Sequence, residues 1–135
     1  MLAASLGTPY ELQTEETILF IEDIATKPYQ IDRMLMQLKY AGKFDNVRGI
    51  VFGEMTECVQ SVRQPYTLQE VVMRVLADFD FPVAYGLRSG HVSMGNITLP
   101  IGVKAKLHVS DNSVELEIKE AATMRRSAGS QAVHS

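Results

Sequence analysis

Apolar residues are arranged along this chain as short continuous runs separated by stretches with helical spacing. Residues 18–21 and 50–52 are apolar and rich in β-branched side chains, a composition typical of buried strands. Residues 82–86 form a third short run bounded by turn-forming residues. The sequence therefore predicts three short strands with helices between them.

The two intervening stretches each carry the signals of an amphipathic helix. Pro28 is compatible with a first helical turn, and Gly42 with a C-terminal stop. Between them, the apolar positions at helical spacing are Ile31, Met34, Leu35, Leu38 and Ala41. Thr67 and Glu70 have the spacing of a capping box, which predicts the start of the second helix. Its apolar face consists of Val71, Val72, Val75, Leu76 and Phe79.

Two more strands are predicted over about 101–109 and 113–119, because the residues between them favour a hairpin turn. The order of strands and helices predicts an α/β fold. We expect a mixed sheet, in which the first three strands are parallel and joined by helical crossovers and the C-terminal hairpin adds an antiparallel part. Residues 1–16 are expected to be a linker entering the domain, 17–120 the folded domain, and 121–135 a disordered tail.

Composition and charge narrow the possible functions. The 135 residues are 46% hydrophobic, enough for one globular core without disulfides or metal. Thirteen basic against sixteen acidic residues argue against nucleic-acid binding. The single cysteine, Cys58, excludes a disulfide framework and a multi-cysteine zinc site. We find neither a membrane span nor a signal peptide in the sequence and expect a cytoplasmic protein without a membrane partner.

Glu22 and His91 are the candidate catalytic residues. Glu22 ends the first buried strand, a common position for a functional carboxylate in α/β sheets, although a surface charge or loop cap is the simpler interpretation. His91 lies in a glycine-rich loop, where a catalytic base or a mobile surface histidine are both reasonable. His108 lies within a predicted strand and His134 in the tail, so both are weaker candidates. A carboxylate and a histidine together suggest two members of a hydrolase triad.

The nucleophile of such a triad is not evident in the sequence. Ser93 lies between glycines, but the spacing does not match a nucleophile elbow, and His91 is only two positions away. Cys58 follows a strand, but the neighbouring Glu54 and Glu57 would raise the pKa of its thiol. The sequence also lacks zinc-ligand spacing and phosphate-binding glycine motifs, so we expect no metal and no cofactor.

Several short segments form an ordered set that covers about residues 6–120. They are 6–11, 18–23, 28–35, 37–38, 41–43, 49–53, 90–91 and 96–102. In this order they resemble the C-terminal domain of the LD-carboxypeptidase family, a group of cytoplasmic serine peptidases that includes the microcin C self-immunity peptidases.

The resemblance implies a swivelling β/β/α domain and a Ser-Glu-His triad. It implies that Glu22 is the triad acid and His91 the base, while the serine comes from a separate N-terminal domain that this sequence does not contain. The implied reaction is hydrolysis of the amide bond before the terminal D-alanine of murein tetrapeptides, in peptidoglycan recycling. The implied partners are the N-terminal nucleophile domain, a peptide substrate and a second copy in a homodimer. Asp32 and Arg33 resemble a family Asp-Arg pair at the start of a helix, without an assigned role.

Three hypotheses follow for the chain. In the first, it is the acid/base part of an LD-carboxypeptidase, inactive alone, with exposed apolar residues where the nucleophile domain packs; a peptidyl- or aminoacyl-nucleotide amidase is the alternative substrate class. In the second, it is a non-catalytic domain that binds peptides or partners and has a closed, polar surface around Glu22 and His91. In the third, Ser93 or Cys58 makes it a self-sufficient hydrolase.

Overall fold

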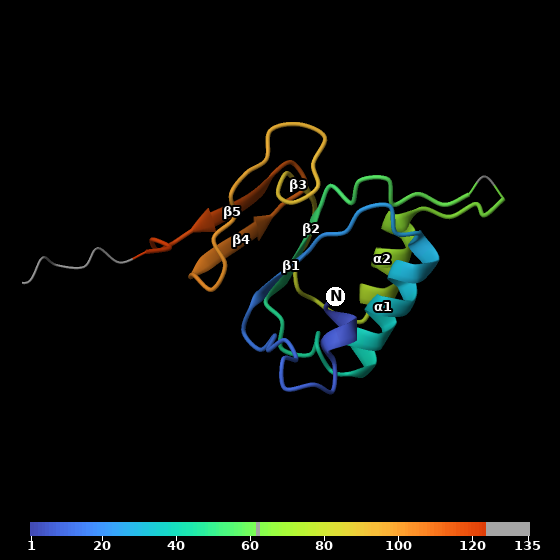
Figure 1. Ribbon diagram of the computed structural model, residues 1–135. Coiled ribbons are helices and arrows are strands. Elements are labelled where there is room, and N and C mark those ends of the chain that lie inside the picture. Colours follow the sequence, from blue (N-terminus) through green and yellow to red (C-terminus); the bar gives the residue numbers. More distant parts are fainter. Residues whose placement is uncertain (62, 124–135) are drawn as a thin grey trace, which may run out of the picture.

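The computed structural model describes residues 1–61 and 63–123. Its elements follow the predicted order of strands, helices and hairpin (Figure 1). They are η1 (Ala3–Ser5), β1 (Ile18–Ile21), α1 (Pro28–Tyr40), β2 (Gly49–Gly53), α2 (Leu68–Leu76), β3 (Val83–Leu87), β4 (Ala105–Val109) and β5 (Val114–Ile118). The α/β class predicted from the sequence is therefore confirmed.

Local sequence signals account for helix ends. At the end of α1, Gly42 adopts a φ of +70°, which favours glycine. The N–H of Lys43 donates to the carbonyl of Leu38 at 3.0 Å, the long hydrogen bond of a Schellman motif. At the start of α2, the Thr67 hydroxyl accepts from the Glu70 N–H at 3.2 Å, while the Glu70 carboxylate accepts from the Thr67 N–H at 2.6 Å. The predicted capping box is thus formed.

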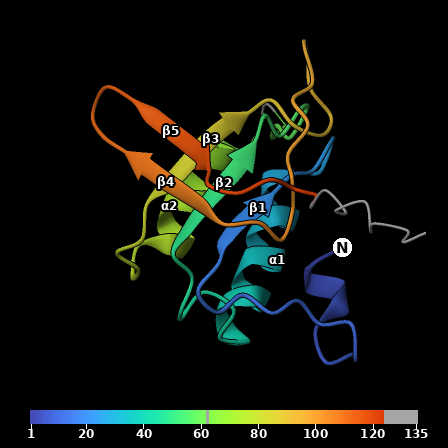
Figure 2. The same ribbon diagram turned by 90° about the vertical axis from the view of Figure 1, so that its left-hand side faces the viewer.

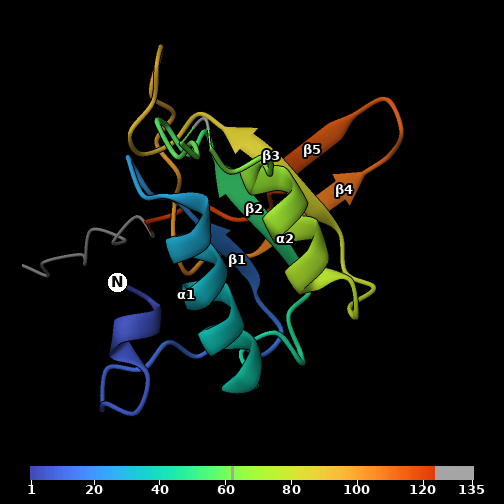
Figure 3. The ribbon, with the colours of Figure 1, turned by 90° about the vertical axis from the view of Figure 1, so that its right-hand side faces the viewer.

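The three strands β1, β2 and β3 form a parallel sheet with β2 in the middle. Both long helices cover one face of this sheet (Figure 3). Every residue of β2 is buried, and the side chains of Ile50 and Phe52 pack into the core with Phe44. Because the strands are parallel, their carboxyl ends and the loops that follow them lie at one edge of the sheet.

Contrary to the expectation of one mixed sheet, the hairpin β4–β5 does not join the parallel strands but forms a separate antiparallel sheet across the other face of the parallel sheet (Figure 2). A Cβ atom at Gly49 in β2 would lie 2.9 Å from Cδ2 of Leu107 in β4, so the hairpin packs directly on the start of β2. Helices, parallel sheet and hairpin make the β/β/α layers that the resemblance implies. β4 begins at Ala105 rather than near residue 101, because Gly102 adopts a φ of +77°, outside the β region.

Residues 1–16, expected from the sequence to be a linker, contain η1 and contribute to the core. Ala3 and Thr14 are buried, and Leu2, Leu6 and Leu12 pack against the core cluster. The tail predicted over 121–135 lies outside the described residues from 124 onward. Among the residues that the structure describes, no helix is long and apolar enough to cross a membrane.

Candidate active site

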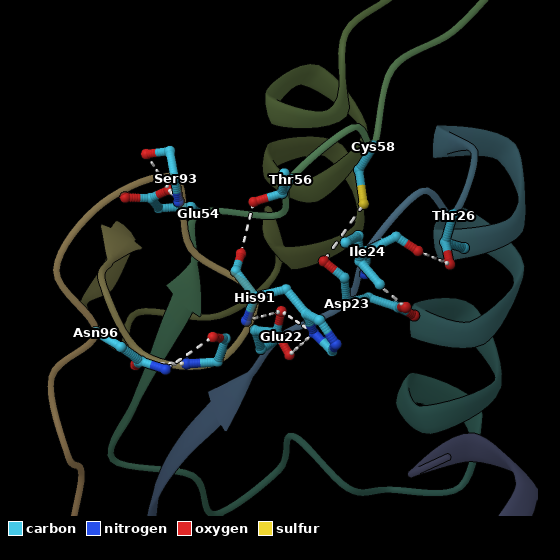
Figure 4. A network of polar contacts seen from close by, with 11 residues as sticks. Glu22, Asp23, Ile24, Thr26, Glu54, Thr56, Cys58, His91, Ser93 and Asn96 are labelled. Carbon is cyan, nitrogen blue, oxygen red and sulfur yellow. Dashed lines mark hydrogen bonds and ion pairs between the residues drawn. The ribbon is translucent and has the colours of Figure 1, made fainter.

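Glu22 and His91 come from two loops at the carboxyl edge of the parallel sheet. Glu22 directly follows β1, and His91 lies in the loop after β3. The two residues are 69 positions apart in the chain, yet their side chains meet (Figure 4). Open α/β sheets commonly bind their ligands at this edge. The structure therefore brings the two predicted site residues together.

The carboxylate of Glu22 accepts hydrogen bonds from two donors of His91. Nδ1 of the ring lies 2.9 Å from Oε1 and 3.1 Å from Oε2, and the backbone N–H donates to Oε1 at 3.0 Å. Because an ionised carboxylate can only accept, Nδ1 carries the proton, and in the neutral ring Nε2 holds the free lone pair. The side chain of Glu22 is 15% exposed and that of His91 is 59% exposed. The carboxylate is thus enclosed while the imidazole is accessible from outside.

Two glycines make room for the Glu22 side chain. A Cβ atom at Gly90, whose φ is +99°, would lie 2.6 Å from Cδ of Glu22 and 2.8 Å from Oε2. A Cβ atom at Gly53, the last residue of β2, would lie 2.8 Å from Cγ of Glu22. Contacts this short do not occur with real Cβ atoms, so any larger residue would displace the carboxylate. The glycine before His91 therefore serves the geometry of the pair.

The loop that carries His91 is held by further hydrogen bonds (Figure 4). The side-chain amide of Asn96 accepts from the Gly90 N–H at 3.2 Å and donates to the Gly90 carbonyl at 3.0 Å. The hydroxyl of Thr56, in the loop after β2, donates to the His91 carbonyl at 2.6 Å. The backbone on both sides of the imidazole is therefore fixed by contacts outside the ring.

Ser93 is close to His91 in the chain, but its hydroxyl is engaged elsewhere. Its Oγ and its N–H both donate to Oε2 of Glu54 at 2.9 Å. These two hydrogen bonds, first the backbone one, hold the pKa of the Glu54 carboxyl below its usual value. Both residues line an open pocket of about 730 Å³ between the loop after β2 and the start of α2. The structure therefore pairs Ser93 with a carboxylate, not with the imidazole.

Cys58 is buried, and its Sγ contacts the carbonyl of Asp23 at 3.6 Å. Burial raises the pKa of its thiol, as expected in direction, but the expected cause was wrong. The carboxylates that contribute are those of Asp23 and Glu22, not the nearer sequence neighbours Glu54 and Glu57. A buried thiol with a raised pKa is a poor nucleophile.

Within the described residues, none of the remaining candidates from the sequence is paired with Glu22 or His91. His108 lies in β4 opposite Glu115, and His134 lies outside the described residues. Asp32 pairs with Arg74 at 2.6 Å and so links α1 to α2. The guanidinium of Arg33 lies 5.8 Å from the ring centroid of Tyr29. Within residues 1–61 and 63–123, no group of three or more His, Cys, Asp or Glu side chains is placed to hold a metal ion.

Sequence reasoning missed Gly53, Thr56 and Asn96 as parts of the site. The sequence marks Gly53 as a strand boundary, and both Gly53 and Asn96 as parts of segments that resemble the family, without a role in the site. Their contacts with Glu22, His91 and Gly90 cross between loops, and no local pattern reports such contacts. The parallel strand order was the one available signal, because it places the loops after β1, β2 and β3 side by side.

Comparisons with known proteins identify the family of this chain. A family model described as the LD-carboxypeptidase C-terminal domain matches residues 1–107. A probable murein peptide carboxypeptidase of Bacillus subtilis (strain 168) is 38% identical over 118 residues, which are 87% of this chain and 37% of that protein. A putative carboxypeptidase of Synechocystis is 40% identical over 103 residues, 76% of this chain and 34% of that protein. The chain thus spans little more than a third of the length of these relatives.

Solved structures show the same fold. The crystal structure of muramoyltetrapeptide carboxypeptidase from Oxalobacter formigenes is 32% identical with a TM-score of 0.77, covering 87% of this chain and 41% of that one. The microcin C7 self-immunity protein MccF, in complex with adenosine monophosphate, is 29% identical with a TM-score of 0.75, covering 91% and 36%. With the family model matching most of its length, this chain belongs to the LD-carboxypeptidase family and corresponds to the family's C-terminal domain.

Proposed function

We propose that this domain supplies the acid and base of a Ser-Glu-His triad in a carboxypeptidase that removes the terminal D-alanine from murein tetrapeptides. One observation carries the proposal: Glu22 accepts the Nδ1 proton of His91 at 2.9 Å while the imidazole stays accessible. A histidine fixed by a carboxylate in this tautomer has Nε2 free to accept a proton from a nucleophile. The names of the relatives, carboxypeptidases of murein peptides, support the substrate class.

In the proposed reaction, the imidazole of His91 first accepts a proton and then donates it. Nε2 of His91 takes the proton of a serine hydroxyl as the oxygen attacks the amide carbonyl. The same nitrogen then gives that proton to the departing amine of D-alanine, leaving an acyl-enzyme that water hydrolyses by the reverse route. Throughout, the carboxylate of Glu22 holds the ring orientation and stabilises the charged imidazolium by opposite charge.

The nucleophile in this proposal comes from another domain, as the resemblance to the family implies. Within the described residues, the side-chain hydrogen bonds of the His91 ring are those with Glu22, and the Ser93 hydroxyl bonds to Glu54. Exposed apolar side chains lie on the same two loops, among them Ile24 after Glu22 and Met94 after His91. The accessible imidazole and its apolar neighbours support the hypothesis that another domain covers this surface. A non-catalytic binding domain would instead have a closed polar surface here.

A second candidate is a peptidyl- or aminoacyl-nucleotide amidase. It is favoured by the structural likeness to MccF, whose structures include complexes with adenosine monophosphate and aspartyl sulfamoyl adenosine. Amide hydrolysis requires the same proton transfers from His91 whichever substrate is cut. The two candidates therefore differ in the leaving group and not in the roles of Glu22 and His91.

A domain exchange tests the proposal. The 135-residue chain replaces the homologous segment of the Bacillus subtilis relative, and D-alanine release from a murein tetrapeptide is measured beside hydrolysis of an aminoacyl sulfamoyl adenosine. We expect D-alanine release by the chimera, none by the 135-residue chain alone, and a loss of at least about 10³-fold in kcat for His91→Gln. His108→Gln is the matched control, because that histidine lies in β4 opposite Glu115.

Three results would contradict the proposal. The first is unchanged activity of the His91→Gln chimera, which would remove the base from this domain. The second is D-alanine release by the isolated chain that is lost on Ser93→Ala or Cys58→Ala. The third is a folded chimera that cleaves the nucleotide substrate but not the tetrapeptide, which would favour the second candidate.

A further inference from the structure

The loop after β2 lies between the two loops that carry Glu22 and His91. This follows from the strand order, in which β2 is the central strand of the parallel sheet. Thr56 lies in this central loop and forms hydrogen bonds to both sides, of which Figure 4 shows the one to His91. Its carbonyl accepts from the N–H of Ala25, in the loop after Glu22, at 2.9 Å. Its hydroxyl donates to the carbonyl of His91 at 2.6 Å.

The backbone around Thr56 is held in an unusual conformation. Met55 has a φ of +52° and Glu57 a φ of +59°, both in the left-handed region that residues other than glycine seldom adopt. Met55 is buried, and the surrounding structure must hold this backbone in place. The loop therefore presents the Thr56 hydroxyl in one defined direction, toward the His91 loop.

The peptide groups on both sides of His91 are consequently fixed. The N–H of His91 donates to Glu22 at 3.0 Å, and its carbonyl accepts from Thr56 at 2.6 Å. Because both of its peptide groups are held, the freedom that remains to His91 is mainly rotation about its side-chain bonds. Nδ1 then meets the carboxylate in the arrangement that leaves Nε2 free.

We propose that Thr56 is a positioning residue for the acid–base pair, acting through its hydroxyl bond to the His91 carbonyl. The proposal rests on the proposed role of His91 as the base, and adds a residue that touches neither the substrate nor the reacting atoms. Thr56 links the loop after β1 to the loop after β3, so it sets the separation of Glu22 and His91. A geometry error of about 1 Å at a catalytic group can reduce a rate by about 10²-fold.

Two variants of Thr56 separate positioning from packing. Thr56→Val keeps the branched shape but removes the hydroxyl, and Thr56→Ser keeps the hydroxyl but removes the methyl group. Thr67→Ala is the control for a general loss of stability, because it removes the cap of α2 instead. Long-range ¹H–¹⁵N spectra of the 135-residue chain report the ring tautomer, and the signals that His91→Gln removes are those of His91. We expect the single Nδ1–H tautomer of His91 in Thr56→Ser and Thr67→Ala. In Thr56→Val we expect a mixture of the two tautomers.

The same variants in the chimera give the kinetic readout. We expect Thr56→Val to lower kcat about tenfold with KM unchanged, and Thr56→Ser to restore it. A Thr56→Val chain that keeps the single tautomer and full kcat overturns the positioning role, while His91→Gln still reports on the base. If His91→Gln itself stays active, the proposed function fails instead. If the chimera gives no activity, the tautomer spectra alone decide the role of Thr56.

Discussion

The close contact of Gly90 with Glu22 predicts a specific effect of adding one methyl group. In Gly90→Ala, the new Cβ would lie 2.6 Å from Cδ of Glu22, and the residue would hold a φ of +99°. The left-handed backbone costs about 1–3 kcal/mol for a residue other than glycine. Displacing the Glu22 carboxylate also disturbs its hydrogen bonds with His91, at a further cost of about 1–3 kcal/mol. We therefore expect Gly90→Ala to lower the free energy of unfolding by about 2–6 kcal/mol.

Two other glycines separate these contributions. Gly86 has a φ of +92°, but a methyl group added there would meet nothing within 4 Å, so Gly86→Ala introduces backbone strain alone. Gly53 does not have a positive φ, but its Cβ would lie 2.8 Å from Cγ of Glu22, so Gly53→Ala introduces the contact alone. Each is expected to lower the free energy of unfolding by about 1–3 kcal/mol.

Urea unfolding of the three variants measures the stabilities, and the ring ¹⁵N spectra report the tautomer of His91. We expect Gly90→Ala and Gly53→Ala to disturb the bond between Nδ1 and the Glu22 carboxylate, whereas Gly86→Ala leaves it intact. If Gly90→Ala matched Gly86→Ala in stability and kept the single tautomer, the carboxylate would have room to move. That result would refute the argument that the two glycines hold Glu22 in place.

Three further predictions concern single contacts. Because burial raises the pKa of Cys58, iodoacetamide should modify the folded chain more slowly than the urea-unfolded chain at pH 8. For the same reason, the contribution of Cys58 to the free energy of unfolding should fall as pH rises above the pKa of the thiol in the unfolded chain. Ser93→Ala should raise the pKa of Glu54 toward its usual value, measured by a carboxyl ¹³C titration with Glu54→Gln for assignment, while the remaining N–H bond keeps part of the shift. Thr67→Ala should lower the free energy of unfolding by about 1 kcal/mol in urea, because the N–H of Glu70 loses its cap.

The elements that could be predicted from the sequence are those whose signals are local. The Schellman motif at Gly42 and the capping box at Thr67 each depend on residues within a few positions of one another. The predicted start of β4 was wrong because the φ of Gly102 depends on the path of the loop, and the apolar pattern does not report it. Glu22 and His91 could be named because one ends a strand and the other lies in a glycine-rich loop.

Contacts between loops could not be predicted in the same way. Thr56 has no motif, and its role depends on bonds to Ala25 and His91, which are 31 and 35 positions away. The parallel order of β1, β2 and β3 creates these contacts by placing three loops at one edge. A sequence pattern can therefore identify candidate catalytic residues more readily than the residues that position them.

The choice between the two candidate substrates depends on residues other than the acid–base pair. The structural neighbours include a muramoyltetrapeptide carboxypeptidase and a microcin C7 self-immunity protein, and both share the fold of this chain. If Glu22 and His91 transfer protons in the same way in both reactions, the pair itself cannot distinguish a D-alanine leaving group from a nucleotide-linked amine. Discrimination must then come from groups that contact the rest of the substrate. Exchanging the exposed side chains of Met94, Ile97 and Ile101 for those of the microcin C7 self-immunity protein keeps Asn96 in place. It should therefore shift KM between the two substrates, while His91→Gln lowers kcat for both.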